Sequence, residues 1–113
     1  MDGAKETNMK ILFVCSGNSS RSPSFERWFK RERPTYDVRS AGIYHGYPYQ
    51  VNFDILSWAD KIYLMDLSHE LFIAARYPEY LYKCEVIGIS DQYIPDSPEI
   101  KELIWYWAKK KGL

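Results

Sequence analysis

An unbroken apolar run, Ile11 to Val14, is followed by a cysteine, five small polar residues and an arginine. A short run that is apolar at every position is typical of a strand buried on both faces of a parallel sheet. Gly17 and Asn18 tolerate positive φ angles, so a tight loop is expected after the strand. Ser22 and Pro23 have the pattern of a helix start, with Ser at the N-cap and Pro at the first helical position. The sequence therefore predicts a strand, a loop and a helix over residues 23–33.

The loop between this strand and helix is expected to bind a phosphate dianion. Successive backbone N–H groups of a tight loop form an anion site, and a helix N-terminus adds about half a positive charge. Arg21 can bind two phosphate oxygens side by side through its planar guanidinium. The expected phosphate-binding residues are Ser16, Gly17, Asn18, Ser19, Ser20, Arg21 and Ser22.

Cys15 is expected to be a nucleophile. Cysteine reacts as the thiolate, and a helix N-terminus and a neighbouring arginine both stabilise that anion. Ser22 is expected to donate a hydrogen bond to the sulfur. The alternative is structural, with Cys15 as a small buried residue that ends a strand and Arg21 as a partner of surface carboxylates. The order of strand, Gly-Asn loop and Ser-Pro helix start favours the catalytic interpretation.

The loop resembles the signature Cys-x-Gly-Asn-x-x-Arg-Ser-Pro of the low-molecular-weight protein tyrosine phosphatases. Here it reads Cys15-Ser16-Gly17-Asn18-Ser19-Ser20-Arg21-Ser22-Pro23, which matches every fixed position. Further similarity lies in Ser40-Ala41-Gly42, in residues 59–66 and, more weakly, in residues 89–93. Residues 9–113 are therefore similar to a shortened member of the family, and residues 1–8 are interpreted as a disordered leader or tag remnant. Full-length relatives carry a longer segment between the Ser-Ala-Gly stretch and the third strand, and part of it shapes the substrate cleft.

This resemblance implies an α/β fold: a single three-layer domain with four parallel strands in the order 2-1-3-4 and helices on both faces. It also implies a cysteine-dependent protein tyrosine phosphatase that hydrolyses phosphomonoesters through a cysteinyl-phosphate. The expected substrate is a phosphotyrosine protein or a small aryl phosphate, and inorganic phosphate is the product. The chemistry requires no metal and no cofactor.

Asp91 is the preferred general acid. It follows the fourth expected strand, and functional residues of parallel sheets gather beyond the carboxyl ends of the strands, where Cys15 also lies. The leaving oxygen needs a proton, and the same carboxylate can then activate water. The family uses an Asp in an Asp-Pro-Tyr-like loop, whereas this chain has Asp91-Gln92-Tyr93 without the Pro.

Asp96 is the competing candidate, because Asp96-Ser97-Pro98 also places an Asp near a Pro. Asp96 has a structural alternative, since Glu99 three residues later would complete a capping box for the last helix. We therefore prefer Asp91 and keep Asp96 as the alternative.

Apolar patterns along the rest of the chain predict strands at residues 36–39, 61–65 and 84–89, and helices at 53–58, 68–76 and 97–110. Asn52 and either Asp66 or Ser68 are expected helix caps. The loop of residues 40–50 contains three tyrosines that either wall a pocket or cover the sheet edge: Tyr44, Tyr47 and Tyr49. His69-Glu70 lacks the second histidine of a zinc motif, so no metal site is expected.

Composition excludes several classes of function. Fifteen basic and fifteen acidic side chains cancel, so the chain lacks the excess of basic residues that would indicate nucleic-acid binding. No run reaches the roughly 18 apolar residues of a membrane span, and no signal peptide is visible, so a reducing cytoplasm is expected. Cys15 and Cys84 are too few for a disulfide framework.

Three other functions compete with phosphatase activity. Arsenate reductase relatives relay a disulfide through further cysteines, but Cys84 is the only other thiol and is placed at the start of a strand. A phosphocysteine carrier would generally lack Arg21. A non-catalytic phosphate-binding or partner-binding module stays open, because the chain is shortened and no Pro follows Asp91.

Overall fold

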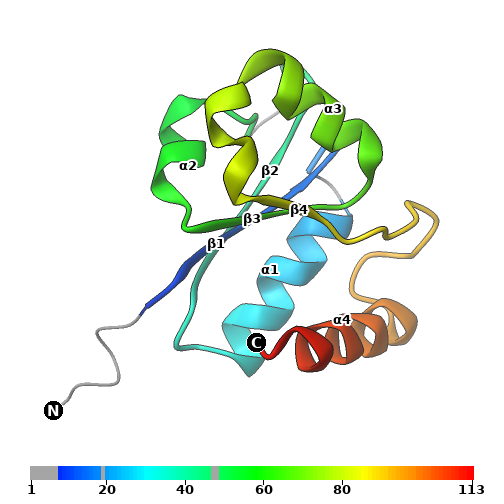
Figure 1. Cartoon of the computed structure of the whole chain (residues 1–113). Helices are drawn as coiled ribbons and strands as arrows, with labels where there is room; N and C mark the ends of the chain where they lie inside the picture. The colour runs from blue at the N-terminus through cyan, green and yellow to red at the C-terminus, as the bar shows by residue number, and fades with distance from the viewer. Residues whose placement is uncertain (1–7, 19, 47–48) are drawn as a thin grey trace, which may run out of the picture.

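Four parallel strands form the centre of the fold in the order β2-β1-β3-β4 (Figure 1). They are β1 (Lys10–Cys15), β2 (Asp37–Gly42), β3 (Lys61–Leu64) and β4 (Cys84–Val86). The computed structural model describes residues 8–18, 20–46 and 49–113. The apolar run of β1 is completely buried, because β1 pairs on both sides and is covered on both faces. The predicted strand order and parallel pairing are confirmed.

Helices cover both faces of this sheet. One face carries α1 (Arg21–Glu32) and α4 (Pro98–Lys111), and the other carries α2 (Phe53–Trp58), α3 (Leu67–Arg76) and the short 3-10 helix η2 (Pro78–Lys83). Figure 1 shows α2 and α3 above the sheet and α1 and α4 below it. Side chains alternate along β1, so Phe13 and Cys15 join the core under α1 while Leu12 and Val14 join the opposite core. The predicted three-layer α/β fold is confirmed.

An aromatic cluster holds α1 and α4 against the sheet. The ring of Phe13 lies 4.9 Å from that of Phe25 and 5.2 Å from that of Phe29, both on α1. Trp107 of α4 contacts the same cluster, with its ring 6.0 Å from Phe13 and 4.8 Å from Tyr63. Burying each such ring contributes roughly 1.5–3 kcal/mol. This packing fixes the N-terminus of α1 directly beyond the end of β1.

The start of α1 differs from the prediction. The helix begins at Arg21 with Ser20 as N-cap residue, two residues before the predicted Pro23. Ser22 is therefore no cap, because its hydroxyl is turned toward Cys15. Ser20 makes no side-chain cap bond to the described residues.

Other boundaries shift by a few residues for visible reasons. β2 continues beyond the predicted Arg39 to Gly42, because Gly42 still pairs with Cys15. β4 ends at Val86, short of the predicted Ile89, since Gly88 has a φ of 88° and turns the chain. Helix α2 has its predicted bounds, and Asn52 caps it through a bond from the Ile55 N–H.

The last helix differs at its start. Ser97 is its N-cap and accepts from the Ile100 N–H, so the predicted capping box of Asp96 and Glu99 is wrong. Asp96 instead has a φ of 58° and forms a salt bridge with Arg27. At the other end Gly112 has a φ of 77°, which suits the residue after a helix.

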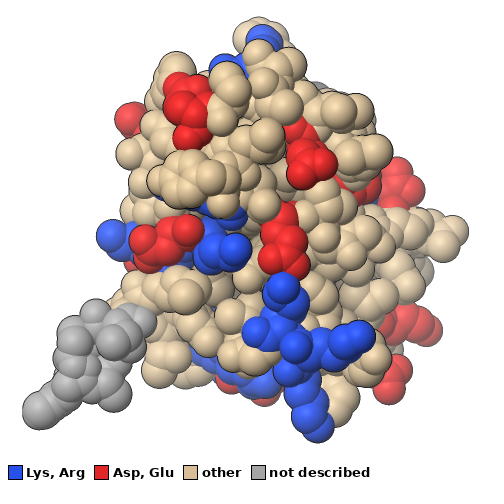
Figure 2. Space-filling view, viewed as in Figure 1, with Lys and Arg blue, Asp and Glu red and all other residues tan. Residues whose placement is uncertain are grey.

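Charges of both signs are interspersed over the face in Figure 2. Blue atoms gather near the C-terminal end of α4, whose last turn contains Lys109, Lys110 and Lys111. Within the described residues, no helix combines the length and apolar character needed to cross a membrane.

Candidate active site

The signature loop, residues 15–22, connects the carboxyl end of β1 to the first turn of α1. Asn18 has a φ of 55°, which makes the tight turn that the Gly-Asn pair predicts. The Ser16 carbonyl accepts hydrogen bonds from the N–H groups of Ile43 and Tyr44 at 2.8 and 3.0 Å. The segment after β2 therefore fixes the loop from outside. Ser19, an expected phosphate-binding residue, lies outside the described residues.

Cys15 and Ser22 contact each other within this loop. Both are buried, with 3% and 0% of their surface exposed, and Ser22 Oγ lies 2.9 Å from Cys15 Sγ. The same hydroxyl lies 3.0 Å from Asn18 Oδ1 and 3.3 Å from the Ala41 carbonyl. A serine hydroxyl has one proton, so it donates to one acceptor at a time, and an anionic sulfur is the strongest of these acceptors. The expected Ser22 contact with the sulfur is present.

Arg21 is held by elements far away in the sequence. Its Nη1 donates to Asp66 Oδ2 and to the Ile89 carbonyl, each at 2.9 Å, and Nη2 lies 3.4 Å from Ser16 Oγ. The residue is 4% exposed. Because both protons of Nη1 are engaged, the guanidinium is fixed at the base of the loop. The side chains after β3 and the backbone after β4 therefore orient it.

Asp66 combines two roles. Its Oδ1 accepts from the Ser68 N–H at 2.9 Å and caps α3, as the sequence predicts, and its Oδ2 pairs with Arg21. Burial alone raises the pKa of Asp66, but hydrogen bonds from Ser68 and Arg21 outweigh it and lower the pKa to about 2. Asp66 is thus a carboxylate at neutral pH that neutralises the buried arginine.

His69 is the residue that sequence reasoning missed. Its side chain is 0% exposed and lies between the start of α3 and the signature loop. Nδ1 is 3.0 Å from the Asp66 backbone nitrogen, and Nε2 is 3.0 Å from Ser16 Oγ. Burial lowers the pKa of His69, and Arg21 adds to this while Asp66 opposes it. The spacing Asp66-x-x-His69 is that of a capping box, which is the signal that points to the buried ring.

A cavity of about 300 Å³ opens above the loop and is lined by Cys15, Ser16, Gly17, Ser20, Arg21, Tyr44 and Asp91. The structure therefore brings the nucleophile candidate, the arginine and the preferred acid candidate to one cavity. Asp96 does not line it. Instead, its carboxylate accepts from Arg27 Nε at 2.9 and 3.1 Å.

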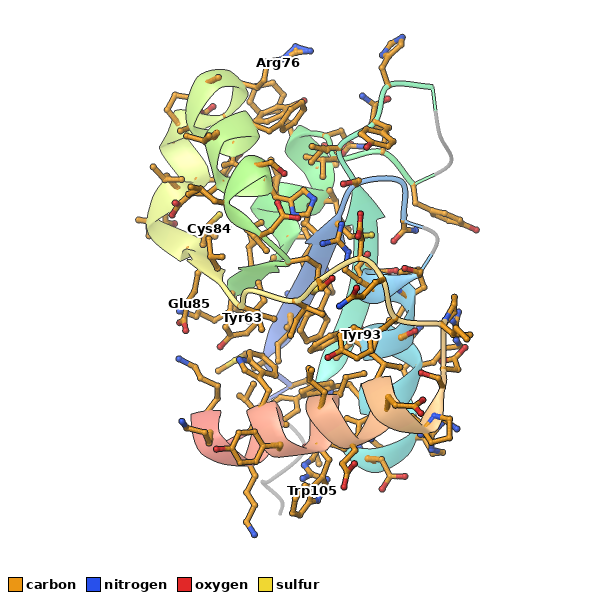
Figure 3. All side chains as sticks on the ribbon, turned by 90° about the vertical axis from the view of Figure 1, so that its right-hand side faces the viewer. Tyr63, Arg76, Cys84, Glu85, Tyr93 and Trp105 are labelled. Carbon is orange, nitrogen blue, oxygen red and sulfur yellow. The ribbon has the colours of Figure 1, made fainter. Side chains whose placement is uncertain are left out.

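The tyrosines of the loop after β2 have separate positions. Tyr44 lines the cavity above Cys15, whereas Tyr49 lines a second cavity of about 570 Å³ that also includes Asn18 and Arg27. Tyr47 lies outside the described residues. Tyr93 is half-buried and packs against the α1–α4 core, and Figure 3 shows its ring between the chain after β4 and α4.

Cys84 lies on the opposite face of the sheet from Cys15. It begins β4 and packs into the core under α2 and α3 (Figure 3). Burial, with a smaller contribution from Glu70, raises the pKa of Cys84 to about 11. The two thiols therefore have the sheet between them.

Comparison with known proteins finds the same family throughout. A profile described as low molecular weight phosphotyrosine protein phosphatase matches residues 10–66, from β1 through Asp66. The low molecular weight protein-tyrosine-phosphatase Wzb of Salmonella typhi is 56% identical over 34 residues, which are 30% of this chain. That stretch spans only 23% of the length of Wzb.

Solved structures extend the similarity to most of the fold. Wzb of Vibrio vulnificus, in complex with benzylphosphonate, superposes with a TM-score of 0.73 at 27% identity, covering 90% of this chain and 98% of that one. A YwlE arginine phosphatase mutant with a phosphorylated active-site serine gives 0.72 at 26% identity, covering 92% and 96%. The profile match over about half of the sequence, together with these superpositions at 26% and 27% identity, shows that this chain belongs to the low molecular weight phosphotyrosine protein phosphatase family.

Proposed function

We propose that this chain is a phosphomonoester hydrolase that acts through a cysteinyl-phosphate. The observation that carries the proposal is the shared cavity of Cys15, Arg21 and Asp91, with Ser22 2.9 Å from the sulfur. A nucleophile, an oxyanion site and a proton donor are the three parts that such a reaction needs.

In the first step the Cys15 thiolate attacks phosphorus in line with the leaving oxygen. The S–P bond forms and the P–O bond breaks, and Asp91 transfers its proton to the departing oxygen. Asp91 is exposed at the rim of the cavity, where the leaving group of a bound ester would lie.

In the second step water attacks the cysteinyl-phosphate. Asp91, now a carboxylate, removes a proton from the water as the new P–O bond forms, and Cys15 leaves as a thiolate. Ser22 stabilises this leaving sulfur through its hydrogen bond. The products are inorganic phosphate and the starting enzyme.

In both steps the signature loop and Arg21 stabilise the negative charge of the transferring phosphoryl group. The backbone N–H groups of the signature loop and the remaining guanidinium protons would bind the three equatorial oxygens of the transferring group. Fixed donors of this kind typically contribute about 10²–10³-fold each in rate. Asp66 and the Ile89 carbonyl support this role by holding Arg21 in place.

The substrate we infer is an aryl phosphate, either phosphotyrosine in a protein or a small ester. Tyr44 supports this inference, because it lines the cavity and is 49% exposed, which puts an aromatic residue beside the place where a flat leaving group would bind. The reaction also needs a reduced thiol, which favours a reducing compartment such as the cytoplasm.

Phosphoarginine is a second candidate substrate. The carboxylate of Asp91 at the rim would pair with a guanidinium, and the solved YwlE relative is described as an arginine phosphatase. Arsenate reduction gains no support, since Cys84 lies on the other face of the sheet.

Hydrolysis of para-nitrophenyl phosphate by the wild type, Cys15→Ser and Cys84→Ser tests the proposal. Turnover should be lost in Cys15→Ser and retained in Cys84→Ser, and mass spectrometry of acid-quenched wild type should detect a phosphate on Cys15. Rates of hydrolysis of two peptides that differ only in carrying phosphotyrosine or phosphoarginine then show which residue is the substrate. Phosphate binding without turnover of any of these esters would favour the non-catalytic module.

A further inference from the structure

His69 is a completely buried titratable residue that has no part in the mechanism above. It reaches the signature loop from α3, 53 residues further along the chain, and its Nε2 lies 3.0 Å from Ser16 Oγ. Ser16 lines the same cavity as Cys15 and Arg21. In the hydrogen bond between His69 and Ser16, either the imidazole or the hydroxyl can be the donor, depending on which ring nitrogen carries the proton.

The backbone of Asp66 fixes the proton on the ring. An amide N–H is always a donor, so Nδ1 of His69, 3.0 Å from the Asp66 nitrogen, must be the acceptor. A neutral imidazole carries a single N–H, which is therefore on Nε2. The Nε2–H group points at Ser16 Oγ, so the histidine donates and the serine accepts.

The Ser16 hydroxyl oxygen then accepts hydrogen bonds from its protein neighbours, and its own proton can still be donated. Its oxygen has two lone pairs. His69 Nε2 donates to this oxygen at 3.0 Å, and Arg21 Nη2 approaches it at 3.4 Å, also as a donor. Among the described residues, none accepts a hydrogen bond from the Ser16 hydroxyl. Its proton is available to an acceptor in the cavity, where an oxyanion would be bound.

We propose that His69 is a positioning residue that makes the Ser16 hydroxyl a hydrogen-bond donor to the phosphate group held in the signature loop. The inference rests on the proposed function in so far as the cavity binds phosphate. It adds one side-chain donor to the backbone amides and Arg21, and it gives the start of α3 an indirect part in phosphate recognition, through Ser16. The capping box keeps the ring in place, because the same Asp66 that holds Arg21 also sets the helix start.

Replacing His69 by glutamine or by asparagine distinguishes a role in positioning Ser16 from a role in packing alone. Glutamine has an acceptor and a donor at its end, so His69→Gln can accept from the Asp66 N–H and still donate toward Ser16. Asparagine can accept from the Asp66 N–H but is too short to reach Ser16. Ser16→Ala removes the proposed donor itself, and the double variant Ser16→Ala/His69→Asn tests whether His69 acts through it.

The readouts are the dissociation constant of inorganic phosphate, measured by NMR titration, and kcat/KM for para-nitrophenyl phosphate. Ser16→Ala and His69→Asn should each raise the dissociation constant of phosphate and lower kcat/KM by about 10- to 100-fold, the usual effect of removing a hydrogen bond to a charged group. His69→Gln should stay within about threefold of the wild type, and the double variant should be no worse than Ser16→Ala. Wild-type phosphate affinity in Ser16→Ala would overturn the proposal, as would additive losses in the double variant.

A spectroscopic measurement on the wild type covers the case in which His69→Asn fails to fold. Nitrogen NMR of the imidazole should report the tautomer protonated at Nε2, and a proton on Nδ1 would overturn the assignment. If the wild type binds phosphate but hydrolyses no ester, the proposed function fails, while the phosphate affinities still decide the role of His69.

Discussion

Gly42 lies directly against the signature loop, where a Cβ atom would come within 2.7 Å of the Ser16 carbonyl oxygen and 2.8 Å of the Asn18 nitrogen. Both contacts are with backbone, which cannot rotate away as a side chain can. The end of β2 is therefore a template on which the loop rests, and the hydrogen bonds from Ile43 and Tyr44 to Ser16 complete it. This contact gives a physical reason for the glycine in Ser40-Ala41-Gly42.

Gly42→Ala should displace the loop while the sheet remains folded. A shift on the order of 1 Å in a catalytic group can cost about 10²-fold in rate, so we expect kcat/KM for para-nitrophenyl phosphate to fall by about that factor. Circular dichroism should show the wild-type secondary structure.

Gly112→Ala is the control for replacing a glycine. Its φ of 77° makes the change strained, but among the described residues none apart from its chain neighbours lies within 4 Å of the new Cβ, and the residue follows α4. It should lower stability by about 1–2 kcal/mol without changing kcat/KM. Equal activity losses in the two variants would contradict the template role of Gly42.

The strands and the signature loop could be predicted because local pattern and one motif determine them, whereas the strand order is implied only by the resemblance to a known family. The run from Ile11 to Val14 is buried on both faces, as its composition requires, and Gly-Asn makes the tight turn. The start of α1 could not be placed from Ser22-Pro23, because Ser22 has a tertiary partner in Cys15 that competes with capping.

Long-range contacts explain the other differences. Asp96 matches a capping box in sequence, yet Arg27, 69 residues away, draws it into a salt bridge. His69 contacts Ser16 across 53 residues, and no local pattern in either segment reveals that pairing. Strand topology and the resemblance to the family's Asp-containing loop both predict Asp91 near Cys15, and Asp91 lines the same cavity as Cys15 in the structure.

Ser22→Ala should slow release of phosphate from the cysteinyl-phosphate. Removing a hydrogen bond to a charged group costs about 1.5–3 kcal/mol, or roughly 10- to 100-fold in kcat. The leaving thiolate loses its donor, so a burst of para-nitrophenol followed by a slow phase is expected in stopped-flow experiments.

Ser24→Ala on the same helix is the control for this variant. Ser24 is also buried, but its hydroxyl accepts from the Asp96 N–H at 3.0 Å instead of contacting the sulfur. Its cost should appear in stability, at about 1 kcal/mol, and not in kcat. A Ser22→Ala enzyme with wild-type kcat would contradict the role given to its hydroxyl.

Asp91→Asn and Asp96→Asn distinguish the two acid candidates. Loss of the acid should matter most for a poor leaving group, so Asp91→Asn should reduce turnover of phenyl phosphate by about 10²–10⁴-fold and of para-nitrophenyl phosphate much less. Asp96→Asn removes an exposed salt bridge that is worth about 0–1 kcal/mol, and activity should be retained. The reverse pattern of losses would assign the acid to Asp96.

Asp66 should make the wild type sensitive to strong acid. The hydrogen bonds from Ser68 and Arg21 lower its folded-state pKa from 3.8 to about 2, so the unfolded chain takes up the proton first. The stabilising contribution is complete above about pH 3.8 and disappears as the pH falls toward 2. Urea unfolding of Asp66→Asn across this interval should show a weaker dependence on pH than the wild type, and identical slopes would contradict this assignment.

His69 should act on stability in a different pH range. Burial, aided by Arg21, lowers its pKa below the ordinary 6.5, and protonation of Nδ1 would also break the hydrogen bond from the Asp66 N–H. The unfolded chain therefore binds this proton more readily, and the free energy of unfolding should decline as the pH falls below about 6.5. His69→Gln cannot titrate, so it should lose this slope, whereas His45→Gln, in an exposed loop, should keep it. A wild-type slope in His69→Gln would show that folding leaves the pKa of His69 unchanged, and it would contradict the assignment of this pH dependence to the buried ring.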